Sequence, residues 1–239
     1  MIKLSSRLNT IAEEIEMGET MADIGTDHGF LPVFLWEKGI CPKVVMTDVS
    51  SGSLAKARLN CQTIHPEADF DLRLGNGLEV LEPGEVDAVV IAGMGGILMT
   101  EILGADIEKA WSFKKIILQP RNRIGQLRFW LYDNCFSIIN EKLVREGKFI
   151  CEVLTAVPKE VAITRDLSAD DIEYEFPHKL IDFKNDLTEE YLQKKLELEK
   201  QILVSMSSAK QEDLCGLRRQ KYRVEYLQNL LRRCKEDEH

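Results

Sequence analysis

Four short segments in the N-terminal half of the chain combine glycines with acidic or amide side chains. They are Asp23-Ile24-Gly25-Thr26-Asp27-His28-Gly29, Thr47-Asp48-Val49-Ser50, Gly75-Asn76-Gly77-Leu78 and Gly93-Met94-Gly95-Gly96. Glycine lets the backbone adopt positive φ and approach a bound molecule closely. A carboxylate beside it accepts hydrogen bonds from hydroxyl groups. The four segments therefore predict a small-molecule site built from backbone contacts and a few polar side chains.

The first segment differs from the Gly-x-Gly-x-x-Gly loop of dinucleotide-binding proteins, because Asp27 stands where that loop has its middle glycine. A carboxylate there would repel a pyrophosphate, which argues against NAD and FAD, but not a cofactor that carries an amino acid and a sulfonium. Asp48 lies 23 residues after Gly25, where an acidic side chain binds ribose hydroxyls. With the polar turn at 75–78, these features predict an S-adenosylmethionine site. The alternative is a flavodoxin-like or nucleotide-binding sheet whose glycines only form turns.

Each of these segments follows an apolar run of strand length, and helical patterns lie between the runs. The expected strands are Thr20–Gly25, Lys43–Asp48, Phe70–Leu74, Ala88–Ala92 and Lys115–Gln119, and the expected helices are Leu4–Ile15, Phe30–Lys38, Ser50–Gln62, Ile97–Leu103 and Gly125–Asn134. Apolar strands that alternate with helices indicate an α/β fold with a doubly wound parallel sheet. Phe136–Glu146 and Phe149–Val157 are expected to add an antiparallel edge. Ligands of such sheets bind beyond the carboxyl ends of the strands, where the four segments lie.

The sequence changes character after this sheet domain, which is expected to span 1–160. Within 161–239, apolar residues from Leu192 onward recur at spacings of three and four among charges, which predicts two long helices. Ser207-Ser208 marks the expected reversal of a coiled-coil-like helical hairpin, and Gly216 is a competing break. The alternative is a dimerisation arm, which would make the protein a weak homo-oligomer. The second helix carries a basic cluster of Arg218, Arg219, Lys221 and Arg223.

Composition restricts the class of protein. The 239 residues are 44% hydrophobic and 30% charged, with a net charge of −9, which indicates a globular chain without an overall basic surface. One segment, Ser112–Lys148, departs from this average with eight basic and three acidic residues. No apolar run reaches the roughly 18 residues of a membrane helix, and the six cysteines include no C-x-x-C pair. We therefore expect a cytoplasmic protein with reduced thiols, no membrane partner and no metal site.

The four segments, together with Ile91-Ala92 and Leu118-Gln119-Pro120-Arg121-Asn122, resemble the bacterial TrmK family, tRNA (adenine-N1)-methyltransferases that act on position 22. The resemblance runs from about Leu4 to Val157 and extends to the helical part. It implies a Rossmann-like class I methyltransferase domain, S-adenosylmethionine as methyl donor, and tRNA as substrate.

The resemblance also implies roles by position. Gly25 and Gly29 would flank the methionine part of the cofactor, Asp48 would hold the ribose, and Asn76 with Leu78 would frame the adenine. Family members often carry aspartate where this chain has Asn76. The remaining cofactor positions are Asp23, Thr26, Asp27, His28, Val49, Ser50, Gly77, Ala92, Gly93 and Met94.

Methylation of adenine at N1 requires alignment more than acid–base catalysis, because N1 has a lone pair and the sulfonium methyl is already activated. We expect Asp27 to accept a hydrogen bond from the N6 amino group and to stabilise the positive charge that develops on the ring. The alternative is a structural carboxylate that caps the following helix. Gln119 and Asn122 are expected to contact the base, unless they only cap a turn. The expected tRNA contacts are Gly95, Gly96, Arg121, Arg123, Arg218, Arg219, Lys221 and Arg223.

Two other functions fit the same residues. One is a class I methyltransferase that acts on a small molecule or a protein, and the other is a catalytically idle RNA-binding or dimerisation module. The basic cluster of the second long helix favours RNA over a small molecule. The four intact glycine segments favour an active enzyme over an idle module.

Overall fold

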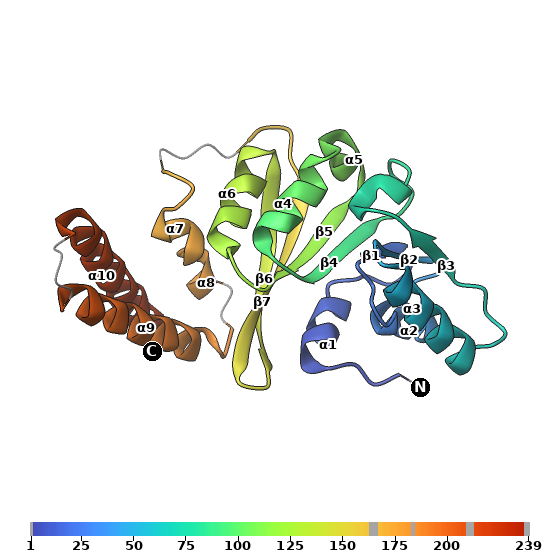
Figure 1. Ribbon diagram of the computed structural model, residues 1–239, viewed down its shortest axis with the longest axis horizontal. Coiled ribbons are helices and arrows are strands. Elements are labelled where there is room, and N and C mark those ends of the chain that lie inside the picture. Colours follow the sequence, from blue (N-terminus) through green and yellow to red (C-terminus); the bar gives the residue numbers. More distant parts are fainter. Residues whose placement is uncertain (1, 163–166, 183–184, 209–212, 237–239) are drawn as a thin grey trace. The chain divides into compact units, whose positions relative to one another are not determined.

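A seven-stranded sheet forms the centre of the first of two units in the computed structural model (Figure 1). The structure describes residues 2–162, 167–182, 185–208 and 213–236. The two units are Met1–Ala169 and Asp170–His239. The division thus lies after residue 169, whereas the boundary expected from the sequence lies after residue 160.

The strands occur in the order β3-β2-β1-β4-β5-β7-β6. Strands β1 to β5 pair in parallel, and β7 pairs antiparallel with both β5 and β6. This order confirms the predicted parallel sheet with an antiparallel edge. The strand bounds are β1 Met21–Ile24, β2 Val44–Asp48, β3 Asp71–Leu74, β4 Ala88–Met94, β5 Lys115–Pro120, β6 Phe136–Glu146 and β7 Phe149–Pro158.

Helices connect the parallel strands, as the alternating pattern predicts. Helices α2 and α3 pack on β1, β2 and β3, whereas α4 packs on β4, β5 and α6 (Figure 1). The first helix is shorter than predicted, and two short elements, η1 and α5, were not predicted. The bounds are α1 Ser6–Ala12, α2 Phe30–Glu37, α3 Ser51–Ile64, η1 Gly77–Val80, α4 Gly96–Gly104, α5 Ile107–Ser112 and α6 Ile124–Asp133.

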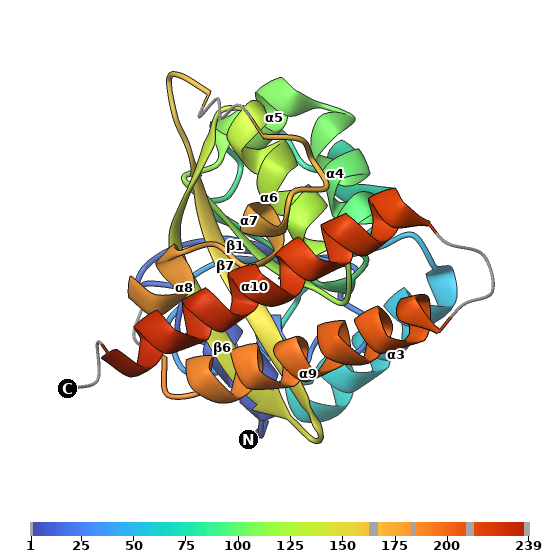
Figure 2. The same ribbon diagram turned by 90° about the vertical axis from the view of Figure 1, so that its left-hand side faces the viewer.

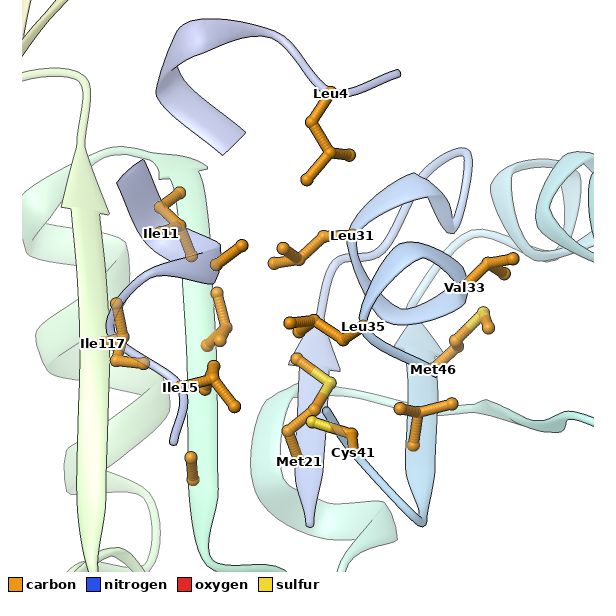
Figure 3. Close-up of a cluster of buried hydrophobic side chains, with 14 of the residues drawn as sticks. Leu4, Ile11, Ile15, Met21, Leu31, Val33, Leu35, Cys41, Met46 and Ile117 are labelled. Carbon is orange, nitrogen blue, oxygen red and sulfur yellow. The ribbon is translucent and has the colours of Figure 1, made fainter. Parts of the chain in front are cut away.

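A buried apolar cluster fixes α1 against α2 and the sheet. Ile11 of α1 is fully buried and lies in one cluster with Leu31 and Leu35 of α2 and with Ile117 of β5 (Figure 3). Burial of one such side chain stabilises the fold by about 1.5–3 kcal/mol. The cluster therefore holds α1 in place, and with it Arg7, the second residue of that helix.

The order of the strands reverses beside β1. From β1 the chain moves to β2 and β3 on one side, and it then returns to β4 on the other side of β1. The two strands are in register, with Ile24 opposite Ile91. A crevice beyond the carboxyl ends of strands at such a reversal is the usual ligand site of an open α/β sheet. The first and fourth glycine segments meet there.

The second unit is helical. It consists of α7 Ile172–Glu175, α8 Lys179–Asp182, α9 Thr188–Ser207 and α10 Leu214–Glu236. Helices α9 and α10 lie side by side and antiparallel (Figure 2), with Leu192 and Leu196 of α9 and Leu227 of α10 buried. Helix α9 ends at Ser207, which confirms the predicted reversal, and Gly216 lies inside α10. The coiled-coil geometry of the pair stays a prediction.

No helix in the described part of the chain is long and apolar enough to cross a membrane. Among the described residues, no group of three or more His, Cys, Asp or Glu side chains is placed to hold a metal ion. The six cysteines are free thiols. Burial raises the pKa of the Cys41 thiol to about 12, so this thiol stays protonated at neutral pH.

Candidate active site

A cavity of about 520 Å³ lies at the carboxyl ends of β1, β2 and β4, with the turn after β3 at its side. Pockets for cofactors and drug-sized ligands commonly have this volume. Most of the predicted cofactor residues and one predicted tRNA contact line it, namely Asp23, Gly25, Thr26, Asp27, His28, Asp48, Val49, Asn76, Gly77, Ala92, Gly93, Met94 and Arg121.

The other predicted residues of this unit lie outside the cavity lining. Several of them shape the loops that carry the lining residues. Gly29 is the N-cap residue before α2 and has φ +71°, the Ser50 hydroxyl caps α3 by accepting the Ser53 N–H at 3.3 Å, and Leu78 is buried. The full set is Gly29, Ser50, Leu78, Gly95, Gly96, Gln119, Asn122 and Arg123.

Asp48 ends β2 with a buried carboxylate that two backbone groups hold in one orientation. Its Oδ1 accepts the N–H of Ser50 at 2.8 Å, and its Oδ2 accepts the N–H of Asp27 at 3.3 Å. An ionised carboxylate has about four acceptor positions, so about two remain for a ligand. Asp48 therefore joins the first two loops and still offers acceptors to the cavity.

Asp27 has a backbone conformation that non-glycine residues seldom adopt. Its φ is +48°, in the left-handed region, where aspartate is tolerated better than most residues. The middle glycine of a dinucleotide loop would occupy this position without strain, whereas the Cβ of Asp27 makes the positive φ unfavourable. The Asp27 carboxylate lies 3.4 Å from Nε2 of His28 and 3.8 Å from Nζ of Lys56, and it is 57% exposed.

Gly25 and Met94 meet where β1 and β4 end. Gly25 has φ +77°, and a Cβ at this position would lie 2.2 Å from Cε of Met94. Real carbon atoms do not approach this closely, so a larger residue would have to displace the Met94 side chain. Gly77 is similarly restricted, because its Cβ would lie 2.8 Å from Cγ2 of Ile102. Glycines thus let the backbone form the wall of the cavity.

The glycine loop after β4 is braced by the segment after β5. The N–H of Arg121 donates to the carbonyl of Met94 at 2.7 Å, and the N–H of Gly96 donates to the carbonyl of Asn122 at 3.1 Å. A Cβ on Gly96 would lie 2.7 Å from the carbonyl oxygen of Arg123. Backbone hydrogen bonds therefore join the predicted substrate residues of the two segments at the edge of the cavity.

Gln119 does not face the cavity, although it is predicted to contact the base. Its side chain is buried, its Oε1 accepts a hydrogen bond from Nη1 of Arg7 at 3.0 Å, and its Nε2 donates to the carbonyl of Pro120 at 2.9 Å. Both ends of the amide are therefore engaged within the protein. The observed contact of Gln119 is to Arg7, a cavity residue that the sequence analysis did not identify.

Arg7 reaches the cavity from α1, before the first strand. The backbone N–H of Arg7 donates to Oε2 of Glu146 at 3.2 Å, and the side-chain Nε of Arg7 lies 3.8 Å from Oε1 of Glu146. A positive charge beside the apolar positions Leu8 and Ile11 on one short helix was the only signal that could have identified it. The aromatic ring of Phe30 also lines the cavity and was not predicted.

Asp23, the penultimate residue of β1, is the most deeply buried acid of the cavity, at 7% exposure. Burial, followed by the neighbouring charge of Asp48, raises its pKa to about 6, while the hydroxyl of Thr26, which donates to Oδ2 at 2.7 Å, and the charge of Arg7 act in the opposite direction. Thr47 adds a fully buried hydroxyl that has no hydrogen-bond partner in the described part of the chain. The inner cavity thus holds polar groups that the protein itself leaves incompletely satisfied.

The predicted basic cluster of α10 divides into two kinds of residue. Arg218, Arg219 and Lys221 are exposed. Arg223 instead pairs with Glu199 at 2.6 Å and with Glu175 at 2.7 Å, and it is only 19% exposed. These two carboxylates compensate its charge within the helical unit, so Arg223 holds α10 to α9 and α7.

The fold and the cavity define a methyltransferase domain. Residues 4–154 match a family model described as "Methyltransferase domain". A tRNA (adenine(22)-N(1))-methyltransferase of Bacillus subtilis is 37% identical over 155 residues, which make up 65% of this chain and 65% of that relative. The match therefore spans slightly less than two thirds of the relative's length.

Solved structures extend the likeness to both units. The crystal structure of the B. subtilis m1A22 tRNA methyltransferase TrmK aligns with a TM-score of 0.83 and 30% identity, over 97% of this chain and 100% of that one. A candidate tRNA (m1A22) methyltransferase of Streptococcus pneumoniae, solved with S-adenosyl-L-methionine, aligns with a TM-score of 0.82 and 26% identity, over 96% and 100%. The chain belongs to the TrmK family, as its loop segments suggested.

Proposed function

We propose that this protein transfers a methyl group from S-adenosylmethionine to N1 of adenosine 22 in tRNA. The observation that carries the proposal is the cavity at the β1–β4 reversal, which is lined by the glycine and acid residues that the TrmK resemblance assigns to the cofactor. Membership of the family supplies the substrate, because the B. subtilis relative is named for adenosine 22 of tRNA.

The residues present fit S-adenosylmethionine. Gly25 turns the chain at the end of β1 with a positive φ and leaves room for the Met94 side chain in the cavity wall, and Asp48 keeps acceptors suited to ribose hydroxyls. The buried hydroxyl of Thr47 lacks a partner among the described residues. Asn76 and Gly77 line the side of the cavity where the adenine would lie. The bound cofactor would supply an activated sulfonium methyl group.

The target adenine needs a position in which N1 points at that methyl group. The braced loop of Gly95 and Gly96 offers backbone atoms beside the cavity, and the amide of Asn122 lies within reach of Gly95, whose Cβ would be 3.2 Å from its Oδ1. The exposed carboxylate of Asp27 would accept a hydrogen bond from N6 and stabilise the positive charge on the alkylated ring. No base is needed to remove a proton from N1.

Cations on both units would hold the tRNA. Exposure of the base from a folded tRNA costs a few kcal/mol, which phosphate contacts must offset. Arg121 is exposed at the cavity lining, and Arg123 is exposed in the same loop. On α10 the exposed cations named above would contact other phosphates, whereas Arg223 is engaged with glutamates.

Incubation of the purified protein with methyl-labelled S-adenosylmethionine tests this function. The acceptors are an unmodified tRNA transcript that contains adenosine 22 and the same transcript with guanosine there. Label in 1-methyladenosine, from the first transcript only, is the expected result. Label that appears only in small molecules or proteins of a cell extract would support a different methyltransferase, and no transfer to any acceptor would support an idle binding module.

A further inference from the structure

The hairpin of β6 and β7 extends beyond the parallel strands on the side of the sheet that carries the cavity. Strand β7 is antiparallel to β5, and the last pair between them joins Leu118 to Leu154. Strand β7 begins five residues before Leu154, at Phe149, whereas β5 continues for only two residues after Leu118, to Pro120. The tip of the hairpin therefore projects past the carboxyl end of β5, beside α1 (Figure 1).

This tip adjoins the cavity through Arg7. Glu146 ends β6 and lies directly opposite Phe149, so both side chains project from the same face of the hairpin. The carboxylate of Glu146 accepts the backbone N–H of Arg7 and lies 3.8 Å from Nε of the same residue. Since Arg7 lines the cavity, Phe149 is the cross-strand neighbour of a residue that contacts the cavity wall.

The ring of Phe149 is exposed at the end of a two-residue turn. The side chain is 63% exposed. The turn consists of Gly147, with φ +59°, and Lys148, whose Nζ lies 5.2 Å from the centre of the Phe149 ring. A single exposed apolar side chain is common and implies no function by itself. Here the exposed ring is combined with a cation over its face and with a place beside the cavity.

The charges of the basic segment Ser112–Lys148 are concentrated on the same side. Four of its eight basic residues pair with acidic side chains at 2.7–2.9 Å, namely Lys114, Lys115, Arg128 and Lys142. The other four are exposed in the loop after β5 or in the hairpin, namely Arg121, Arg123, Arg145 and Lys148. The acid opposite Phe149 is compensated by Arg7, so it does not cancel this positive charge.

We propose that Phe149 is a stacking site for an unpaired base of the tRNA and that Lys148 binds an adjacent phosphate. The inference rests on the proposed function, because it concerns the RNA around the methylated adenosine. An aromatic side chain stacks on the face of any base, and a neighbouring cation binds the backbone of the same strand. The cations of the tip and of the loop after β5 favour RNA over a protein segment as the partner of the ring.

A stacking site at this place would assist exposure of the target adenine. When adenosine 22 leaves its stack, each neighbouring base loses one stacking partner, which is part of the cost of exposing the base. A ring beside the cavity replaces that partner while the adenine is inside. Phe149 is then a positioning residue that acts on the RNA and not on the cofactor.

Binding of the tRNA transcript that contains adenosine 22, measured at several salt concentrations, tests this site. Phe149→Ala should weaken tRNA binding about ten- to a hundredfold and leave the log–log salt slope unchanged, because stacking releases no counterions. Lys148→Gln should instead reduce that slope by about 0.7–0.9. Phe149→Trp should bind tRNA at least as tightly as the wild type, whereas Phe149→Leu, which is apolar but has no aromatic face, should bind as weakly as Phe149→Ala.

Ile139→Ala is the matched control, because Ile139 is 53% exposed in the same hairpin, at the irregularity between Ile138 and Asn140 far from the tip. This variant should bind tRNA as the wild type does, and every variant should keep the wild-type affinity for S-adenosylhomocysteine.

Three results would overturn the stacking site. They are equal tRNA affinities of Phe149→Ala and Ile139→Ala, full recovery of affinity in Phe149→Leu, and a loss of S-adenosylhomocysteine affinity in Phe149→Ala, which would indicate a structural role. An unchanged salt slope in Lys148→Gln would overturn the phosphate contact. If the wild type neither binds nor methylates the transcript, the proposed function itself fails.

Discussion

Replacement of Asp23 by asparagine should stabilise the ligand-free protein at neutral and alkaline pH. Asp23 is buried with one hydrogen bond from Thr26 and no paired cation among the described residues. Its pKa in the folded state rises from the ordinary value of 3.8 to about 6, mainly because burial disfavours the charged form. The folded protein therefore holds a proton on Asp23 that the unfolded chain has already released between these two values.

The magnitude follows from that difference. Where the folded state binds more protons than the unfolded state, the free energy of unfolding falls as the pH rises. The stability that depends on a protonated Asp23 is therefore fully present below about pH 4, and it is lost as the pH rises through about 6. A difference of one pKa unit corresponds to about 1.4 kcal/mol, so the rise from 3.8 to about 6 lowers the free energy of unfolding by about 3 kcal/mol at pH 8. The asparagine amide must find its own acceptor, at a cost of about 1 kcal/mol. Asp23→Asn should thus gain about 2 kcal/mol at pH 8.

Urea unfolding followed by circular dichroism from pH 4 to pH 8 measures this effect. The advantage of Asp23→Asn should appear between pH 4 and pH 6 and then level off, whereas Asp48→Asn, at a carboxylate with two backbone donors, should show no such gain. A variant that is less stable than the wild type at pH 8, or a gain that does not depend on pH, would refute the reasoning.

Three further predictions concern the cofactor, the base and the tRNA. Asp48→Ala should weaken S-adenosylhomocysteine binding by about ten- to a hundredfold in calorimetry, because a charge-assisted ribose contact is lost; an unchanged Kd would remove Asp48 from the site. Asp27→Asn, which tolerates positive φ, should lower kcat by about tenfold or more and change cofactor affinity by less than about twofold; equal losses would indicate a cofactor role instead. Replacement of Arg218, Arg219 and Lys221 by glutamine should reduce the log–log salt slope of tRNA binding by about 0.9 per lost contact, and an unchanged slope would leave dimerisation as the role of α10.

Most of the parallel strands could be predicted because they are short apolar runs that end at a turn. Val44–Asp48, for example, is buried at every position, and Ser50 then caps the next helix as expected. The helical elements that the sequence analysis missed are too short to show a hydrophobic periodicity. Helix α5, Ile107–Ser112, spans fewer than two turns, and η1 begins at a glycine. Helix α1 ends at Ala12 although Ile15 continues its apolar spacing, because Ile15 packs from the turn that follows.

The site could be predicted where position in the fold decides the role. Asp48 follows from its place at the end of a strand, and Gly25 from the turn after another. Arg7 was missed because its place at the cavity depends on how α1 packs against the sheet, and a single sequence does not reveal that packing. Arg223 looked like a free cation because its partners, Glu175 and Glu199, lie 48 and 24 residues away.

The most direct test of the central claim is the position of the methyl group. A methyl on N1 blocks base pairing, so reverse transcription of the treated tRNA transcript should stop immediately before nucleotide 22. The account predicts that stop only when both the protein and S-adenosylmethionine are present, and its loss when adenosine 22 is replaced by guanosine. Full-length extension of the treated transcript, or a stop at any other adenosine, would contradict it.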